Sequence, residues 1–102
     1  MKALLNYTDK FMKIIIDLIN IKDKESFHSI IKEKLNFPSY YGNNLDALFE
    51  CLTDISYETD IIFKNFDFFE ARCKDYSVIV KNVFAEAVRF NKKLNIIFNN
   101  YY

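Results

Sequence analysis

The chain has 102 residues, 51% hydrophobic and 18% aromatic, which fits one domain whose core needs no metal or disulfide to hold it together. One glycine and one proline are too few for the many tight turns of a β-sandwich or barrel, so helices with a few strands are expected. The formal net charge is zero, which argues against binding of the whole surface to nucleic acid or to an anionic membrane.

The first elements expected are a strand and a helix. Residues 1–10 show no pattern, and the first dozen residues are a possible extension. Lys13–Ile19 holds a β-branched run typical of a strand buried on both faces. Asp23 or Ser26 is expected to cap the helix that follows, which ends before Pro38.

The polar residues inside the first apolar run also bear on location. The run from Phe11 to Ile21 is interrupted by three charged or amide side chains, so it predicts neither a signal-peptide core nor a membrane span. We therefore expect a cytoplasmic protein.

Five more elements follow the proline. They are a helix from Asn44 to about Thr53, a strand over Asp60–Lys64, a short helix around Phe66–Ala71, an amphipathic helix from Asp75, and a strand over Leu94–Phe98. Strands separated by helices require parallel pairing with right-handed crossovers. The expected fold is α/β, a single domain over residues 1–102 with a three-stranded parallel sheet, about four helices and the order β-α-α-β-α-α-β.

The two cysteines and the one histidine give no sign of a reactive site. Cys51 and Cys73 lack the spacing of a zinc site or a disulfide framework, so two reduced thiols and no metal or cofactor are expected. His28 has no cysteine or acid at catalytic or metal-ligand spacing, and we expect it on the surface of its helix.

The helix from Asn44 carries an unusual charge pattern. At 100° per residue, Asp46, Glu50 and Asp54 share one face, opposite the apolar side chains. Like charges at this spacing destabilise an isolated helix by roughly 0.2–0.5 kcal/mol per pair, and no lysine or arginine lies between Leu35 and Asp60 to offset them. The pattern is typical either of a solvated face or of a site for a basic partner.

The stretch Pro38–Asp54, PSYYGNNLDALFECLTD, resembles the central signature of the barstar family of ribonuclease inhibitors. The family pattern is Pro-x-Tyr-Tyr-Gly-x-Asn-Leu-Asp-Ala-Leu-x-Asp-Cys-Leu-Thr. Val83–Ala87 is similar to part of the family's last helix, and the expected element order matches the family fold from about Met12 to Phe98. The resemblance implies a barstar-like fold and an inhibitor, not an enzyme.

The resemblance also implies a mode of action. In the family, a loop and the following helix enter the active-site cleft of a ribonuclease, where a carboxylate takes the place of substrate phosphate. This implies that Glu50 mimics phosphate, that Asp46 bonds a second basic group, and that the partner is a secreted ribonuclease or nuclease toxin. No direct contact with nucleic acid or membrane is expected. The partner-binding residues implied are Tyr40, Gly42, Asn44, Leu45, Asp46, Phe49, Glu50, Thr53 and Glu86.

Aromatic residues beside the acids support this interpretation, because Tyr40, Tyr41 and Phe49 would supply the stiff apolar surface that interfaces favour. The sequence also departs from the family pattern, with Glu50 in place of the usual Asp and Phe49 in place of the usual Trp. These changes allow a different target enzyme.

Two other functions remain open. One is an immunity or adaptor protein on the same scaffold whose partner is not a ribonuclease. The other is a small enzyme that uses Asp46 and Glu50 as a general acid and base, which would require a concave pocket around the pair.

Overall fold

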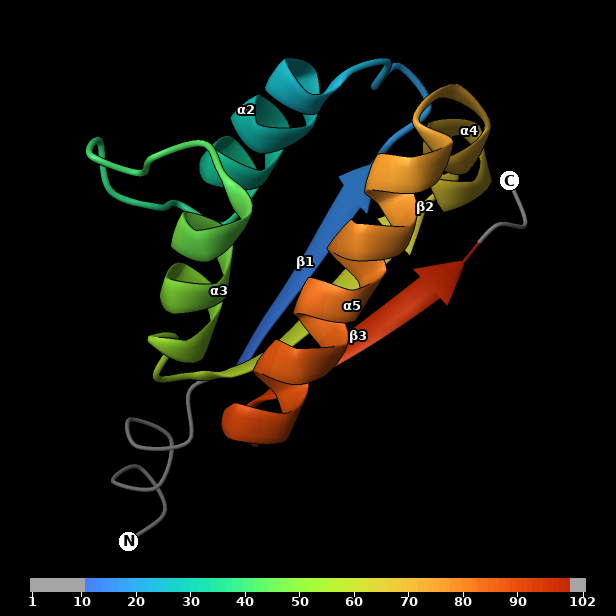
Figure 1. Cartoon of the computed structure of the whole chain (residues 1–102). Coiled ribbons are helices and arrows are strands. Elements are labelled where there is room, and N and C mark those ends of the chain that lie inside the picture. Colours follow the sequence, from blue (N-terminus) through green and yellow to red (C-terminus); the bar gives the residue numbers. More distant parts are fainter. Residues whose placement is uncertain (1–10, 100–102) are drawn as a thin grey trace, which may run out of the picture.

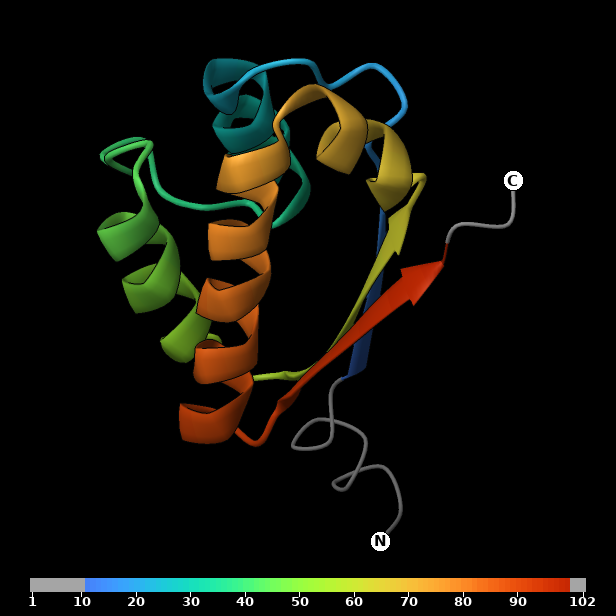
Figure 2. The same cartoon turned by 45° about the vertical axis from the view of Figure 1, so that its right-hand side comes forward.

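The computed structural model describes residues 11–99, and the expected order of strands and helices is confirmed (Figure 1). The elements are β1 (Phe11–Asp17), α2 (Lys24–Lys34), α3 (Leu45–Thr53), β2 (Glu58–Lys64), α4 (Phe66–Arg72), α5 (Lys74–Phe90) and β3 (Leu94–Asn99). The sheet is parallel, with β2 between β1 and β3. In both views α2, α3 and α5 lie on the same side of the sheet (Figures 1 and 2).

One face of the sheet is buried by helices and the other is not covered by any described element. In β1, Ile16 is fully buried whereas its neighbour Ile15 is 49% exposed. In β2, Ile61 and Phe63 are fully buried, while Ile62 between them is half-buried. The prediction of a first strand buried on both faces is therefore wrong. A β-branched run indicates a strand, but only the placement of the helices decides how many of its faces are covered.

β1 begins and ends two residues earlier than the predicted range Lys13–Ile19. Phe11 pairs with Glu58 in the first rung of the sheet, so the strand reaches into the first dozen residues. Residues 1–10 lie outside the described residues. Asp17 ends the strand, because its carboxylate accepts a hydrogen bond of 3.0 Å from the backbone N–H two residues later.

Local side-chain chemistry sets both ends of α2. The Asp23 carboxylate accepts a hydrogen bond from Ser26 N (2.8 Å) and Ser26 Oγ accepts one from Asp23 N (3.3 Å), which is a capping box. At the other end Asn36 is left-handed (φ 54°) and Phe37 N donates to Lys32 O (3.0 Å), the Schellman arrangement. The helix therefore ends before the proline because an asparagine reverses the chain.

Phenylalanine side chains fill much of the core between the sheet and the helices. Phe63 of β2 packs edge-on against Phe66 and Phe84, with ring centroids 5.6 and 5.2 Å away, and Phe27 of α2 stacks on Phe69 at 4.8 Å. These five rings are buried, whereas Phe68 of α4 is exposed. In the described part of the chain, no helix has both the length and the apolar character needed to cross a membrane.

Candidate protein-binding site

The loop before α3 is shaped by an asparagine cap. Asn44 Oδ1 accepts a hydrogen bond from Ala47 N (2.8 Å), and Asn44 Nδ2 donates to Gly42 O (3.2 Å). A Cβ atom on Gly42 would lie 3.1 Å from Asn44 Nδ2, so a larger residue there would require the Asn44 side chain to shift slightly. The left-handed turn itself is made by Asn43, with φ 54°. Gly42 and Asn44 thus fix how the chain enters α3.

The three carboxylates of Asp46, Glu50 and Asp54, which we call the acidic ridge, are exposed along α3. Leu48 and Leu52 on the opposite side are fully buried, as the helical spacing predicted. Among residues 11–99, no ion pair includes a residue of the acidic ridge. Glu50 and Asp54 also lie at the carboxyl end of the helix, where the dipole disfavours negative charge.

Grooves flank the acidic ridge on both sides. Tyr40, Glu50 and Thr53 line one groove of about 460 Å³, together with residues of the loop that follows α2. Asp46 and Glu86 line another of about 330 Å³ between α3 and α5. Neither of these grooves is lined by both Asp46 and Glu50. An acid–base pair of an enzyme would instead face one common concave pocket.

The aromatic residues near the acidic ridge occupy three different environments. Tyr40 is 84% exposed in the loop before α3. Phe49 is half-buried, with its ring edge-on to Phe90 of α5 at 5.9 Å. Tyr41 is only 5% exposed and belongs to the core, so the prediction that it adds apolar surface beside the acids is wrong.

Glu86 is exposed on α5, where it forms an ion pair with Arg89 (2.8 Å between Nη1 and Oε2). Both side chains are largely in solvent, so this pair contributes little to stability and is readily exchanged. The second groove brings Glu86 to the same surface as Leu45, Asp46 and Phe49.

His28 is buried, with 2% of its surface exposed, so its predicted place on the helix surface is wrong. Its Nδ1 lies 2.6 Å from the Tyr41 hydroxyl and its Nε2 lies 2.7 Å from the Tyr76 hydroxyl. Burial lowers the pKa of His28, so the ring is neutral, donating from one nitrogen and accepting at the other. His28 lies three residues before Ile31, a spacing that brings it to the buried side of α2. The tyrosine hydroxyls that accommodate its ring are distant in sequence.

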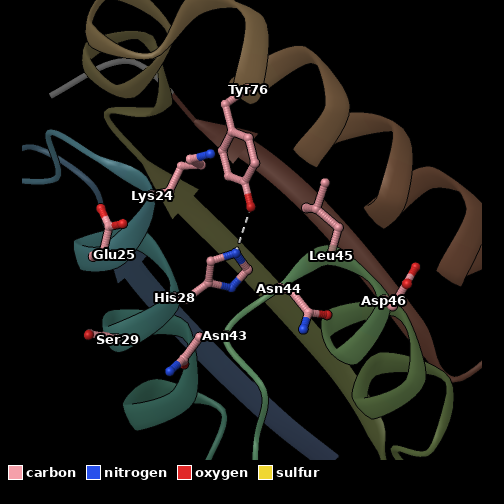
Figure 3. Close-up of a pocket in the computed structure, with 9 residues that line it drawn as sticks. All are labelled: Lys24, Glu25, His28, Ser29, Asn43, Asn44, Leu45, Asp46 and Tyr76. Carbon is pink, nitrogen blue, oxygen red and sulfur yellow. Dashed lines mark hydrogen bonds between the residues drawn. The ribbon is translucent and has the colours of Figure 1, made fainter.

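This histidine lies at the bottom of a third groove, of about 620 Å³, between α2, the amino end of α3 and the start of α5 (Figure 3). Asp46 lies at one end of the groove and Glu25 at the other. The hydrogen bonds of His28 join α2, α5 and the loop before α3. They therefore hold in place the segment that carries Tyr40.

We expect the stability of the protein to fall as the pH drops from about 7.5 through 6.5, the ordinary pKa of histidine in an unfolded chain. Because burial lowers the pKa of His28 in the folded protein, the unfolded chain binds more protons in this pH range. Stability stops falling once the pH is below the pKa of His28 in the folded protein. One proton limits the slope to about 1.4 kcal/mol per pH unit. Urea unfolding at several pH values measures it.

The variant His28→Gln is the control for this prediction, because it removes the titrating ring. Its slope between pH 7.5 and 5.5 should be absent. The carboxylates of Asp17 and Asp23 do not interfere, since hydrogen bonds lower their pKa values and their contribution is lost only at more acidic pH. A wild-type protein with pH-independent stability over this range would contradict a neutral, buried His28.

The family model described as Barstar (barnase inhibitor) matches residues 11–101. The chain belongs to the barstar family. It is 42% identical over 76 residues to the protein named "Putative ribonuclease inhibitor YrdF" of Bacillus subtilis (strain 168), an alignment that covers 74% of this chain and 84% of that protein. The resemblance read from the sequence and the barstar-like α/β fold are thus confirmed, and the chain falls in a family of ribonuclease inhibitors.

Proposed function

We propose that this barstar-family chain inhibits a ribonuclease by inserting the acidic ridge and the preceding loop into its active site. Glu50 takes the position of a substrate phosphate, and Asp46 bonds a second basic group. The observation that carries the proposal is the acidic ridge itself, whose three carboxylates project from α3 with no ion-pair partner among the described residues.

The chemistry of the target supports this role. A ribonuclease must present fixed positive groups to bind and stabilise phosphate, and it cannot lose them without losing activity. A carboxylate bonds such groups through short charge-assisted hydrogen bonds. An inhibitor that displays carboxylates on a rigid helix therefore binds the one feature that the enzyme must keep.

The local structure also reduces the cost of binding. The Asn44 cap and the tight approach at Gly42 hold the loop before association, so little conformational entropy is lost on docking. Tyr40 and Phe49 flank the carboxylates with apolar surface that can exclude water from the charge pairs. We propose that the protein acts in the cytoplasm as an immunity protein against a secreted ribonuclease or nuclease toxin.

Inhibition of RNA cleavage tests the function. Purified chain is titrated into barnase, the enzyme in the family's description, and into any nuclease encoded beside this gene. We expect the activity of at least one enzyme to fall to zero at one chain per enzyme molecule. The charge-reversed Asp46→Lys/Glu50→Lys chain should not inhibit, whereas Glu33→Lys, which reverses an exposed charge on α2, should. Full activity of every enzyme in excess wild-type chain would contradict the proposal.

The association rate should fall as salt is added, by roughly tenfold between 50 mM and 1 M NaCl. The attraction arises from the acidic ridge and not from the net charge, which is zero, so the effect should be smaller than for a strongly acidic inhibitor. Stopped-flow mixing of the chain with the inhibited enzyme measures the rate. A rate independent of salt would indicate an apolar interface instead.

A further inference from the structure

The sheet face opposite the helices displays an ordered pattern of side chains, and we call it the open face. Each of its rows runs across all three strands in register. The central row is Ile15, Ile62 and Ile97, the row before it is Lys13, Asp60 and Asn95, and the row after it is Asp17, Lys64 and Asn99.

The central row is apolar and accessible. Ile15 is 49% exposed, Ile97 is 38% exposed, and Ile62 between them is half-buried. Helices α2, α3 and α5 all lie on the other side of the sheet (Figure 2). Three isoleucines side by side form a contiguous apolar strip between two rows of polar and charged residues.

We propose that the open face binds the open face of a second copy of this chain. The two-fold axis lies along the isoleucine row, so that equivalent strands of the two copies lie over one another and run antiparallel. This operation reverses the order of the rows and places isoleucine on isoleucine. A two-fold interface of this kind is isologous, the commonest form of homodimer.

The charges on either side of the strip favour this arrangement. Under the same operation Lys13 lies over Asp17 of the second copy, and Asp60 lies over its Lys64. Each charged residue of these three rows thus meets the opposite charge, and symmetry makes every pair occur twice. The Asp60 carboxylate accepts a hydrogen bond from Asn95, and the Asp17 carboxylate accepts two, from Asn65 and from Ile19 N. All of these bonds go to Oδ1, and the Oδ2 atoms can accept from a further donor.

The other face-to-face arrangement brings like charges together. With the two-fold axis parallel to the strands, β2 lies over β2 and runs in the same direction. Asp60 would then lie over Asp60 of the second copy, and Lys64 over Lys64. Opposed like charges are unfavourable, so the charge pattern discriminates between the two arrangements.

The size of the open face sets the expected affinity. Three strands spaced by about 4.8 Å, with a rise of about 3.3 Å per residue, give a patch of roughly 14 by 20 Å. This area is well below the roughly 800 Å² per partner of a standard interface, so we expect a dissociation constant on the order of 100 µM. The acidic ridge lies on the helical side, so both copies keep it free, and the dimer does not depend on the proposed inhibitor function.

Amide chemical shifts recorded between 20 µM and 1 mM test the proposal, with sedimentation equilibrium over the same range to give the mass. We expect concentration-dependent shifts centred on Ile15, Ile62 and Ile97, and a mass that rises towards that of two chains. A chain that stays monomeric at 1 mM overturns the proposal, whatever covers the face. Shifts centred on the helices or on the edge of β1 or β3 also overturn it.

Charge exchange on β2 tests the orientation. Asp60→Lys places lysine over Lys64 of the second copy at two equivalent positions and should weaken the dimer by roughly tenfold. Asp60→Lys/Lys64→Asp recreates both opposite pairs and should restore it. Glu33→Lys, the same change of charge on α2, should have no effect. Circular dichroism verifies that each variant is folded. A dimer that Asp60→Lys does not weaken would contradict the antiparallel arrangement, and so would a double variant that does not restore dimerisation.

Discussion

Replacing Glu50 by lysine is expected to weaken binding to the inhibited ribonuclease by roughly 30-fold to several thousand-fold. Removing one member of a buried charge pair costs about 2–5 kcal/mol of binding free energy. This range comes from measurements on protein complexes that include barnase–barstar. The stability of the free protein should not fall, because Glu50 is exposed near the carboxyl end of α3, where a cation is preferred to an anion. Titration calorimetry and urea unfolding measure the two effects.

Binding affinity should therefore fall without a fall in stability. A residue with a purely structural role would lower both. Glu50→Gln keeps the length of the side chain and isolates the loss of charge, while Glu50→Asp introduces the residue usual in the family. Against an enzyme with the usual cleft, Glu50→Asp should bind at least as well as the wild-type chain. Unchanged affinity of Glu50→Lys would contradict a central role for this carboxylate.

The largest loss of stability at a polar position is expected for Asn91→Ala, about 2–4 kcal/mol, or roughly 10–20 °C in Tm. The Asn91 amide donates to Leu52 O (3.0 Å) and Ile55 O (2.9 Å), and its Oδ1 accepts from Lys93 N (3.0 Å). The residue is 8% exposed, so truncation removes three hydrogen bonds at a largely buried position and leaves Ile55 O and Lys93 N without these partners, while Leu52 O keeps its bond from Ile55 N (3.3 Å). Thermal unfolding measures the change.

Two further variants make the Asn91 prediction specific. Asn91→Asp keeps the acceptor for Lys93 N but loses both donors, so it should destabilise the protein at least as much as alanine. Asn82→Ala removes an exposed asparagine of α5 and should change stability by no more than about 0.5 kcal/mol. Because Asn91 bonds the carboxyl end of α3, its loss should also loosen the acidic ridge. Near-wild-type stability of Asn91→Ala would show that these hydrogen bonds contribute little.

Helical and strand periodicity carried most of the fold prediction. The apolar spacing of α5 and the buried row of α3 follow from side chains that repeat along a single element, and sequence alone reveals such repeats. The burial of His28 depends on the hydroxyls of Tyr41 and Tyr76, which lie 13 and 48 residues away in the chain. A contact of that separation leaves no local pattern.

The exposure of residues on the open face could not be predicted from the individual strands either. Ile14, Ile15 and Ile16 look equivalent in the sequence, yet Ile16 is fully buried and Ile15 is half exposed. The difference arises because the described helices all cover one side. The register that aligns Ile15 with Ile62 and Ile97 is likewise a property of strand pairing, which the individual strands do not specify.

For the candidate site, the sequence predicted the face of the carboxylates but not their surroundings. The 100° step of a helix suffices to place Asp46, Glu50 and Asp54 together. The grooves that flank them, and the Arg89 partner of Glu86, come from elements brought together by folding. Contact of these residues with a ribonuclease stays a prediction.

Competition for the enzyme's phosphate site tests the central claim most directly. A ribonuclease that this chain inhibits is titrated with the chain in the presence of increasing concentrations of a nucleoside 3′-monophosphate. If the acidic ridge occupies the position of phosphate, the apparent Kd of the chain rises linearly with the nucleotide concentration, by a factor of one plus the ratio of that concentration to the nucleotide's own dissociation constant. An apparent Kd that does not change with nucleotide would show that the chain binds elsewhere, and would contradict phosphate mimicry by α3.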